Sequence, residues 1–529
     1  MHTQFRRCFG ALVSLLFLSA CQSTAPRVAA PAIPPATVAP APSSGSLTVQ
    51  RFEFTGNTVY TAEQLSDITK PYTGRALSLP ELHEAADKVA AFYASQGYTL
   101  AAVTVPPQSV AGGVVRLEVL EGRIGKVLIE GNNRYTLEQV EHYLPGIAEG
   151  KVYHSTTLEA GLDRISHLPG LPRARAVLRP GAEYGTSDVM IQAHEETFSA
   201  GLAVDNHGRE ALGETRTALT ATLNNPLRLA DEAQALYLRS QSGLLEYGNL
   251  GYGIGLGQDS RLTASYGEAR FNTTLVGLTG ITVDGLNRSA RLAFDTALTR
   301  TRSQDFVLGA AVSNTEATAD LQGIAISAVE LSLLELSARQ RQTFASGAVT
   351  QWSATVATSF GSACEMSAGC EDQPLRFEAD AQRLQPIAGR LDGYLRVNTV
   401  YSPDPLPELT QVALGGPTNV RGHPSAEVRG DTGAFASLGV RQAFNAGPVT
   451  ILARVFGDAG RVSAQSPYGS SNTLSSVGVG FDAYWRAQAF SASARMDLSF
   501  PTDNHDQNTS PPPSDPSDQR LFASLSVNF

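Results

Sequence analysis

The 529-residue sequence is poor in charged residues, which make up 17% of it, against the roughly 25% that is usual for soluble proteins. After residue 20 it has no apolar run that approaches the ~20 residues that a membrane-spanning helix needs. Forty-eight glycines accompany this scarcity of charge. If the chain spans a membrane, it must therefore do so with strands, and its composition fits a membrane barrel.

The sequence also lacks the features of nucleic-acid binding and of catalysis. The net charge of −10 argues against a nucleic-acid partner, since such proteins usually carry a basic patch and a high pI. No G-x-S-x-G elbow, P-loop, H-E-x-x-H or C-x-x-C motif is present, so we expect no enzyme activity, no cofactor and no metal. His194-Glu195-Glu196 has no second ligand at the required spacing, and we interpret it as a solvated junction between domains.

The four cysteines are few but informative in their positions. Cys8 lies in the leader (residues 1–20), where two arginines precede a short apolar core, as in an export signal. Cys364 and Cys370 lie in one polar stretch, and two nearby cysteines in a loop of an exported protein favour a small disulfide. A metal pair is the weaker alternative, because no His cluster accompanies them.

The leader ends in Leu-Ser-Ala-Cys, and this tetrapeptide resembles the lipobox of bacterial lipoproteins. The resemblance implies cleavage before Cys21 and acylation of that cysteine. Ordinary signal cleavage beside an incidental cysteine is the alternative. Residues 21–47 are dominated by Ala, Pro, Ser and Thr and are expected to form an extended linker. Because they show no helical periodicity, we expect no helical plug from them.

Two related units follow the linker. The sequence FEFTGNTVY at residues 52–60 recurs as VLIEGNNRY at residues 127–135, which defines a tandem repeat of about 75 residues. Each unit is predicted to contain one strand, two helices and two further strands. The patterns predict helices at 61–69, 79–96, 137–144 and 156–168, and strands at 100–105, 113–121, 126–130, 173–179 and 188–193.

Residues 197–529 show no convincing amphipathic helix; short alternating runs are separated by turn or loop signals. A soluble sandwich would alternate in a similar way. The aromatic Phe529 in the last run favours a barrel, because outer-membrane barrels commonly end in an aromatic residue that their assembly machinery recognises. At roughly 20 residues per strand and connection, the region predicts about 16 strands. Residues 445–447 and 485–487 are predicted to be short periplasmic turns.

Two stretches near the end of this region carry the candidate functional residues. The first, LGGPTNVRGH at residues 414–423, is rich in glycine and carries the cation Arg421. The second, FGDAG at residues 456–460, ends an alternating run in which Asp458 shares a face with Phe456. If this face looks into a lumen, Asp458 can meet an arginine on a loop folded back inside, and such contacts are strong when bidentate. The alternative is that both residues are solvated and never meet.

V-R-G in a loop preceded by Gly-Gly, followed at this distance by F-x-D-x-G, resembles the signature of outer-membrane barrels that carry POTRA domains. The whole chain resembles the two-partner secretion transporters of the haemolysin secretion/activation type. The resemblance implies two tandem α+β POTRA domains (residues 48–121 and 122–196) followed by a transmembrane antiparallel β-barrel (residues 197–529). The family motif is usually V-R-G-Y, and His423 replaces its aromatic residue. A second V-R-G at residues 428–430 lacks the Gly-Gly spacing.

The resemblance also assigns roles to single residues. The lumen loop is expected to carry the V-R-G motif and the residue after it: Val420, Arg421, Gly422 and His423. Its partner on the barrel wall is expected to be the F-x-D-x-G motif: Phe456, Asp458 and Gly460. In this interpretation Arg421 is an internal clamp, Asp458 is its partner, and Gly422 and Gly460 let the backbones approach.

The function implied by the resemblance is that of an outer-membrane translocator. POTRA domains in the periplasm would capture an unfolded exoprotein partner by strand addition, and the barrel would secrete it, with activation as a further role. Outer-membrane lipid and the barrel assembly machinery are the other implied partners.

Three alternatives remain open from the sequence. An outer-membrane assembly factor would share the loop motif, but such proteins commonly carry three or five POTRA units. A passive porin would need no client-binding domains. The repeated units would have no partner at all if they only space the barrel from its tether.

Overall fold

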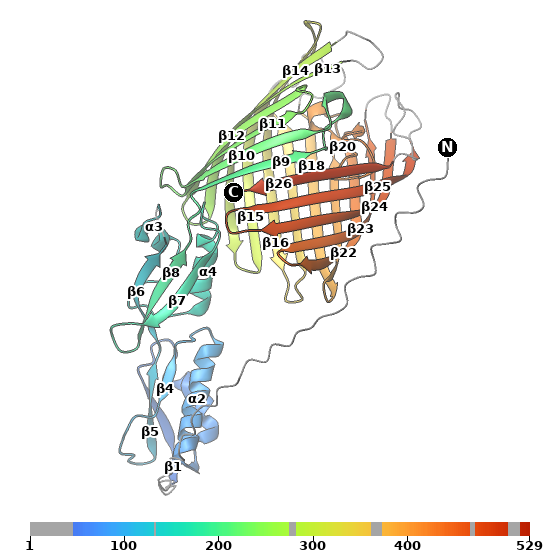
Figure 1. Ribbon diagram of the computed structural model, residues 1–529. Coiled ribbons are helices and arrows are strands. Elements are labelled where there is room, and N and C mark those ends of the chain that lie inside the picture. The colour runs from blue at the N-terminus through green and yellow to red at the C-terminus, as the bar shows by residue number, and fades with distance from the viewer. Residues whose placement is uncertain (1–45, 132–133, 275–281, 361–372, 466–470, 506–518) are drawn as a thin grey trace, which may run out of the picture.

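The computed structural model describes residues 46–131, 134–274, 282–360, 373–465, 471–505 and 519–529. The predictions for the leader, for the linker up to residue 45, and for Cys21, Cys364 and Cys370 lie outside these residues. Within the described chain, two small α/β units lead to a closed barrel (Figure 1). Among the described residues, no helix is long and apolar enough to cross a membrane.

The first unit is a three-stranded sheet with two helices. Its sheet has the order β2-β5-β4, with β2 parallel and β4 antiparallel to β5. Capping boxes at Thr61 and Ser78 fix the starts of the two helices. The elements are β1 (Leu47–Val49), β2 (Arg51–Thr55), α1 (Ala62–Thr69), η1 (Lys70–Tyr72), β3 (Arg75–Leu77), α2 (Leu79–Ser95), β4 (Ala102–Thr104) and β5 (Val114–Leu120). The short pair of β1 and β3 was not predicted, because strands of three residues carry too little pattern.

The second unit repeats this arrangement. Its elements are β6 (Arg123–Glu130), α3 (Leu137–His142), α4 (Ser155–Ile165), β7 (Ala174–Pro180) and β8 (Thr186–Ala193). The sheet has the order β6-β8-β7, with β6 parallel and β7 antiparallel to β8. The predicted order of one strand, two helices and two strands is therefore present in both units.

A carboxylate closes the corresponding turn in each unit. Glu121 accepts a hydrogen bond from the backbone nitrogen of Val59 at 2.7 Å. Glu195 accepts from the backbone nitrogens of Arg134 at 2.7 Å and Tyr135 at 2.9 Å. Residues 194–196 join β8 to the barrel, and His194 and Glu196 are exposed there, as interpreted; Glu195 is partly buried, and its carboxylate also holds the turn that follows the first strand of its unit.

The barrel consists of sixteen antiparallel strands that close between β26 and β9, which confirms the predicted strand number. The strands are β9 (Phe198–Asp205), β10 (Arg216–Asn224), β11 (Asp231–Ser240), β12 (Leu245–Leu256), β13 (Ser260–Thr274), β14 (Thr282–Arg300), β15 (Gln304–Leu321), β16 (Ile324–Thr343), β17 (Val349–Ser359), β18 (Leu375–Ala388), β19 (Leu391–Tyr401), β22 (Thr432–Ala446), β23 (Val449–Ser463), β24 (Ser471–Arg486), β25 (Ser491–His505) and β26 (Arg520–Asn528). A short helical turn, η2 (Glu210–Leu212), lies between β9 and β10.

The two faces of the barrel wall differ in polarity. In β25, Met496 is 48% exposed whereas its neighbour Asp497 is 1% exposed. Alternate residues of a strand point to opposite faces, so in this strand the apolar Met496 faces outward and the charged Asp497 faces the interior. This is the reverse of a soluble protein and is the pattern of a transmembrane barrel.

The predicted short turns differ slightly from the observed ones. β22 and β23 are joined after Ala446, inside the predicted range 445–447. The predicted turn at 485–487 is displaced, because β24 continues through Arg486 and β25 begins at Ser491.

Candidate functional site

The chain between β19 and β22 folds back into the barrel and has a small core of its own. It contains η3 (Glu408–Thr410), β20 (Val412–Leu414) and β21 (Val428–Gly430), and the last two pair antiparallel. The second V-R-G sequence forms β21. Buried apolar side chains of this loop and of the wall pack together: Val400, Val412, Leu414, Val420, Val428, Phe435, Val462 and Leu474. Such packing anchors the loop to the inner wall.

The Gly-Gly step begins the turn that carries the arginine. Gly415 and Gly416 have φ values of +101° and +105°, which L side chains rarely adopt. A Cβ on Gly415 would lie 2.2 Å from the carbonyl oxygen of Pro424. Asn419 closes the turn, since its Oδ1 accepts from the nitrogen of Gly415 at 2.8 Å and its Nδ2 donates to the carbonyl of Ala413 at 3.0 Å.

Arg421 forms a bidentate ion pair with Asp458 of β23. Its Nε donates to Oδ2 at 2.8 Å and its Nη2 donates to Oδ1 at 2.8 Å. The backbone nitrogen of Arg421 donates to Oδ2 at 3.1 Å. Both residues are buried. The alternative prediction, that Arg421 and Asp458 are both solvated and never meet, is therefore wrong.

Two more residues of the barrel wall contact the guanidinium group of Arg421. Ser437 of β22 accepts from Nη2 of Arg421 at 3.0 Å and donates to Oδ1 of Asp458 at 2.7 Å. The Cζ of Arg421 lies 3.4 Å from the centroid of the Phe456 ring, a cation–π contact. A Cβ on Gly478 of β24 would lie 2.4 Å from Cζ of Phe456, so this glycine leaves the space that the ring fills.

A second set of buried charges lies beside the first. Arg454 of β23 donates from Nη2 to Oδ1 of Asp497 at 2.7 Å and from Nη1 to Oδ2 of Asp482. Asp482 also accepts from Nε of Arg495 at 2.8 Å. The Nη1 of Arg421 lies 3.8 Å from Oδ1 of Asp497. The loop arginine thus joins a network that spans β23, β24 and β25.

The residues after Arg421 fit closely against the wall. Gly422 has φ +114°, and a Cβ there would lie 2.9 Å from Cβ of Ser476. His423 is fully buried; its Nδ1 lies 2.9 Å from Oε2 of Glu427 and its Nε2 lies 3.1 Å from the carbonyl oxygen of Ser475. The imidazole therefore makes polar contacts in place of the stacking that an aromatic residue would supply.

Gly460 occupies a tight position under the loop. A Cβ there would lie 2.8 Å from Cδ1 of Leu414 and 3.0 Å from Cβ of Phe435. The loop core could not pack as closely over any larger residue.

Sequence reasoning missed Ser437, Arg454, Asp482 and Gly478 as members of this site. Arg454 shares the strand parity of Asp458, and in VGVGFD (residues 477–482) the glycines and the aspartate share one parity. That parity places them on the inner face. Only the register between strands shows which of them meet, and the sequence does not give that register.

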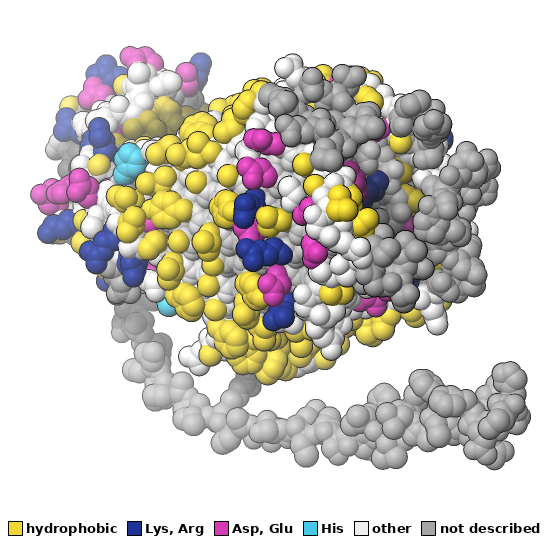
Figure 2. Space-filling view, turned by 90° about the horizontal axis from the view of Figure 1, so that it is seen from above, with side chains coloured by type: hydrophobic (Ala, Val, Ile, Leu, Met, Phe, Trp, Pro, Cys, Tyr) yellow, Lys and Arg dark blue, Asp and Glu magenta, His cyan; other side chains and the backbone are white. Residues whose placement is uncertain are grey.

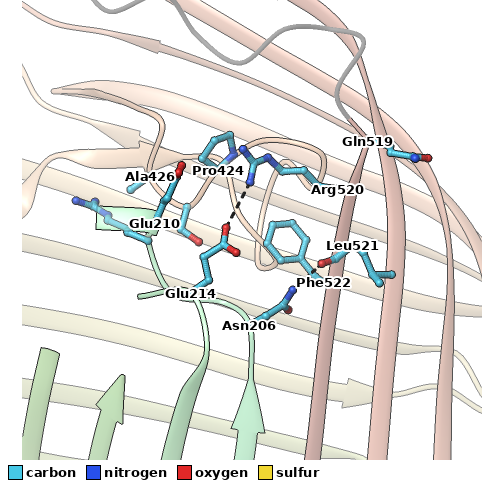
Figure 3. A pocket seen from close by; sticks show the side chains of 12 residues that line it. Asn206, Glu210, Glu214, Pro424, Ala426, Gln519, Arg520, Leu521 and Phe522 are labelled. Atoms are coloured by element: carbon cyan, nitrogen blue, oxygen red, sulfur yellow. Dashed lines mark hydrogen bonds and ion pairs between the residues drawn. The ribbon is translucent and has the colours of Figure 1, made fainter. Parts of the chain in front are cut away.

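A polar pocket of about 610 Å³ lies beside the loop tip. Figure 3 shows that residues of the β9–β10 connection, of the tip and of the start of β26 line it. Nη1 of Arg520 lies 4.0 Å from Oε1 of Glu214. Ser425 at the tip donates from Oγ to the carbonyl of His207 at 3.0 Å, so the loop also contacts the first barrel connection.

The second unit is attached to the periplasmic turns of the barrel. Arg134 donates from Nη1 to the carbonyls of Asn225 and Pro226, each at 3.2 Å. The Nε of Arg164 in α4 lies 3.3 Å from Oδ1 of Asp259. These contacts place the unit at the end of the lumen opposite to the pocket beside the loop tip.

The remaining predicted site residue is Phe529. Its nitrogen donates to the carbonyl of Ala200 at 2.8 Å, and the nitrogen of Ala200 donates to its carbonyl at 3.2 Å. Phe529 thereby continues the β26–β9 pairing. In the part of the chain that the structure describes, no three His, Cys, Asp or Glu residues are grouped as metal ligands would be.

Residues 185–483 match the family model described as "Haemolysin secretion/activation protein ShlB/FhaC/HecB", and residues 47–122 match the model described as "POTRA domain, ShlB-type". The chain belongs to the haemolysin secretion/activation family. The first model covers more than half of the 529 residues.

Curated relatives of this chain are transporters by name. The outer membrane transporter CdiB of Escherichia coli is 28% identical over 206 residues, which cover 37% of this chain and 34% of that protein. The hemolysin transporter protein ShlB of Serratia marcescens is 24% identical over 449 residues, covering 82% of this chain and 78% of that protein. The alignments with the CdiB and HuxB proteins of enteric bacteria and Haemophilus influenzae span only about a third of those relatives' own length.

Solved structures share the fold. CdiB from Escherichia coli has a TM-score of 0.71 at 21% identity, covering 93% of both chains. BamA from Haemophilus ducreyi, lacking its first three POTRA domains, has a TM-score of 0.54 at 12% identity and covers 92% of this chain and 100% of that one. This family member is thus an outer-membrane β-barrel protein with an N-terminal POTRA domain in the periplasm.

Proposed function

We propose that this protein is an outer-membrane translocator that secretes, and also activates, a partner exoprotein. The observation that carries the proposal is the loop held inside the closed barrel by the buried Arg421–Asp458 pair. A passive pore would need no client-binding domains, whereas two repeated units of helices and strands precede this barrel. The related CdiB, HuxB and ShlB proteins are named as transporters.

We infer that two tandem POTRA domains precede the barrel, at residues 48–121 and 122–196, with the barrel at residues 197–529. The match to the POTRA model supports the first domain. The second has the same strand order and the same parallel and antiparallel pairings. Glu195 also closes its first turn as Glu121 closes that of the first domain.

The POTRA domains would capture the unfolded partner in the periplasm. Each of the two three-stranded sheets has two edge strands, β2 and β4 in the first unit and β6 and β7 in the second. An edge strand offers backbone donors and acceptors to an extended chain and asks little of its sequence. The second domain is seated at the periplasmic end of the barrel through Arg134, so a captured segment would lie close to the lumen.

The loop would act as a clamp that must leave its seat during transport. Its ion pair is buried, and a charge removed from such a pair is costly. The loop would therefore have to leave as a unit, so that both charges become solvated. Its departure would need the passing chain to occupy the space in the lumen that the loop vacates. Folding of the partner outside the cell would bias the direction, since no nucleotide-binding motif is present in the sequence.

Other predicted features remain proposals about the same protein. Acylation of Cys21 would tether the N-terminus to the inner leaflet, and a Cys364–Cys370 disulfide would close a surface loop; the intact mass of the mature protein tests both. Phe529 would be contacted by the barrel assembly machinery during insertion. The protein is not proposed to be an enzyme.

The alternative function is that of an outer-membrane assembly factor. The likeness to BamA at 12% identity supports a shared fold alone. The family match and the two repeated units favour secretion over this alternative.

The test is a comparison of culture supernatants from a wild-type and a deletion strain. We expect a large exoprotein to disappear from the supernatant of the deletion strain and to return when the full chain is restored. Unchanged supernatants would overturn the proposal. Loss of many barrel proteins from the outer membrane, with the exoprotein still secreted, would support the assembly factor instead.

A further inference from the structure

The barrel wall builds the whole seat that holds the guanidinium of Arg421. Asp458 and Phe456 belong to β23, and Ser437 belongs to β22; we call these three side chains the wall seat. The loop contributes only Arg421 to it, through the guanidinium and the backbone nitrogen. Strands of the closed barrel hold the wall seat, so it stays in place if the loop moves away.

The wall seat is also oriented without help from Arg421. Ser437 donates from Oγ to Oδ1 of Asp458 at 2.7 Å. The ring of Phe456 fills the space that Gly478 leaves, since a Cβ on Gly478 would lie 2.4 Å from Cζ of the ring. A carboxylate and an aromatic face are thus fixed beside each other, and a preorganised site has less ordering cost on binding.

The charges around the wall seat balance only when Arg421 is present. The set contains three arginines and three aspartates: Arg421, Arg454, Arg495, Asp458, Asp482 and Asp497. Arg454 is shared between Asp482 and Asp497, so it is not free to serve Asp458. Without Arg421, the set has one negative charge in excess.

Other arginines of the inner wall do not make up the difference. Three of them each pair with an aspartate of their own: Arg441 with Asp392, Arg396 with Asp380, and Arg216 with Asp205. Arg441 lies directly opposite Arg454, yet its Nε donates to Oδ2 of Asp392 at 3.2 Å. The excess negative charge would therefore remain at the wall seat.

An unpaired Asp458 would be costly, because its side chain has no exposed surface. Removing one partner of a buried ion pair leaves an uncompensated charge, and such a change is strongly destabilising. A second cation that entered the wall seat as Arg421 left would compensate this charge. Displacement of the loop is therefore easier when a replacement cation is at hand.

The lumen is the route on which such a cation would arrive. Figure 2 shows a broad area of hydrophobic side chains on the outer surface of the barrel, crossed by a band of charged ones. Arginine and lysine are costly in hydrocarbon, so the cationic side chains of a client would pass through the lumen. There the wall seat faces them once the loop is displaced.

The chemistry of the wall seat favours a guanidinium. A carboxylate binds a guanidinium through two parallel hydrogen bonds, and an aromatic face adds a cation–π contact; an ammonium lacks the bidentate geometry. Tyr394 lies beside the seat, since a Cβ on Gly439, the residue opposite Phe456, would be 2.7 Å from its hydroxyl oxygen. Among the described residues this hydroxyl has no hydrogen-bond partner, so it can accept a further N–H.

We propose that the wall seat binds cationic side chains of the translocating chain, arginine in preference to lysine, in place of Arg421. The inference rests on the proposed function, because it needs a client in the lumen. It adds a substrate preference to that function: a client segment with arginine displaces the loop more readily than one without.

The test uses the purified full-length protein in planar bilayers. The probe is an unfolded Gly-Ser peptide with one central arginine, and the matched probe carries citrulline, which has the shape of arginine without its charge. Arg421→Gln leaves the wall seat without its own cation, and the double variant Arg421→Gln with Asp458→Asn also removes the carboxylate. The measurement is the residence time of each peptide in the pore.

We expect the arginine peptide to reside about tenfold longer in Arg421→Gln than in the double variant with Asp458→Asn. The citrulline peptide should reside for the same short time in both. Arg421→Gln with Asp392→Asn is the matched control, because it removes a different aspartate of the inner wall, and it should hold the arginine peptide as long as Arg421→Gln does. In the unaltered protein Arg421 competes, so the residence time should be shorter than in Arg421→Gln.

Equal residence of the arginine peptide in Arg421→Gln and in the double variant with Asp458→Asn would overturn the proposal. So would equal residence of the arginine and citrulline peptides in Arg421→Gln. Heat-modifiable electrophoretic mobility reports whether each barrel has folded. If the double variant does not fold, Arg421→Gln with Phe456→Leu replaces it, with the same expected direction and the same contradicting result.

These recordings need no secreted partner, so their failure is distinct from failure of the proposed function. Equal residence times would remove the cation site and leave the comparison of supernatants unaffected. Unchanged supernatants would overturn secretion even where the recordings show the expected difference.

Discussion

The Cζ of Arg421 lies 3.4 Å from the centroid of the Phe456 ring, and the guanidinium of Arg421 forms a bidentate ion pair with Asp458. Asp458 follows Phe456 by two residues on the same strand. One strand, β23, thus supplies both the aromatic face and the carboxylate. Because alternate residues share a face, the spacing F-x-D places both side chains toward the lumen. The ion pair and the cation–π contact of Arg421 therefore need only one strand and one loop residue.

Replacement of Arg421 by Ala is expected to leave an inserted barrel that secretes poorly. It removes one partner of a buried ion pair, a change that typically costs about 3–5 kcal/mol, and the loop would lose its main polar attachment. Arg421→Lys should give an intermediate result, since an ammonium cannot form the bidentate contact. The measurement is the amount of exoprotein in the supernatant relative to the amount of folded barrel in the outer membrane.

Arg429 provides the control for that experiment, because it belongs to the second V-R-G sequence of the same loop. Its side chain is 30% exposed and pairs with Glu408, which is 79% exposed. Such surface pairs contribute little, so Arg429→Ala should secrete normally. Normal secretion by both Arg421→Ala and Asp458→Ala would remove the clamp from the mechanism.

Replacement of Gly478 by Ala is expected to displace the Phe456 ring. The new Cβ would lie 2.4 Å from Cζ of Phe456 and 2.6 Å from the carbonyl oxygen of Leu498. Overpacking of this kind costs about 1–3 kcal/mol. Thermal unfolding of the barrel measures it. Gly457→Ala is the matched control, since the nearest atom to its Cβ is 3.9 Å away; equal unfolding temperatures for the two variants would contradict the prediction.

The contact between Arg421 and Asp458 was accessible from the sequence because a motif and a strand parity both pointed to it. The contact of Arg454 with Asp497 was not. It depends on the register of β23 with β24 and of β24 with β25, and register is fixed by closure of the whole barrel rather than by local pattern.

In the two small units, too, local features could be predicted from the sequence and long-range contacts could not. The helix starts at Thr61 and Ser78 follow from local capping sequences, so they could be predicted. The role of Glu195 could not, because its partners lie about 60 residues away in the sequence.

Glu121 is expected to stabilise the first unit in a pH-dependent way. Burial alone would raise the pKa of Glu121, but hydrogen bonds from Thr58 and Val59 outweigh it, so that the pKa lies below its usual value. A lowered folded-state pKa gives stability that is present above the unfolded value, ~4.3, and is lost as the pH falls through the folded-state value. Glu121→Gln should therefore be less stable than the unaltered protein at pH 7.

Hydrogen exchange of residues 51–60 in the full-length protein measures this difference. At neutral pH, Glu121→Gln should be less protected from exchange than the unaltered protein. This difference in protection should become smaller at acidic pH, where the carboxyl of Glu121 in the unaltered protein is itself protonated. Exchange of residues 123–130 in the second unit serves as the internal control and should not change. A difference that stays constant over the acidic range would show that the charge of Glu121 is not the cause.

Asn206 is expected to hold the extracellular end of the barrel seam. Backbone hydrogen bonds between β26 and β9 run from Ala200 to Asn206, whose nitrogen donates to the carbonyl of Ala523 at 3.2 Å. Beyond these bonds, the side chain of Asn206 takes the place of a peptide group: Nδ2 donates to the carbonyl of Leu521 at 2.7 Å, and Oδ1 accepts from the nitrogen of Ala523 at 2.7 Å. Figure 3 shows Asn206 directed toward Leu521.

Asn206→Ala should remove both bonds and destabilise this end of the seam by about 1–2 kcal/mol. The amide of Ala523 should then exchange about tenfold faster, since 1.4 kcal/mol corresponds to that factor. Asn206→Asp retains the acceptor for Ala523 and loses only the donor to Leu521, so it should protect Ala523 better than alanine does. Asn314→Ala is the control, because that asparagine bonds to side chains of Glu330 and Ser332 and not to a neighbouring backbone. If Ala523 exchanges at the same rate in Asn206→Ala and the unaltered protein, the backbone pairing alone closes the barrel.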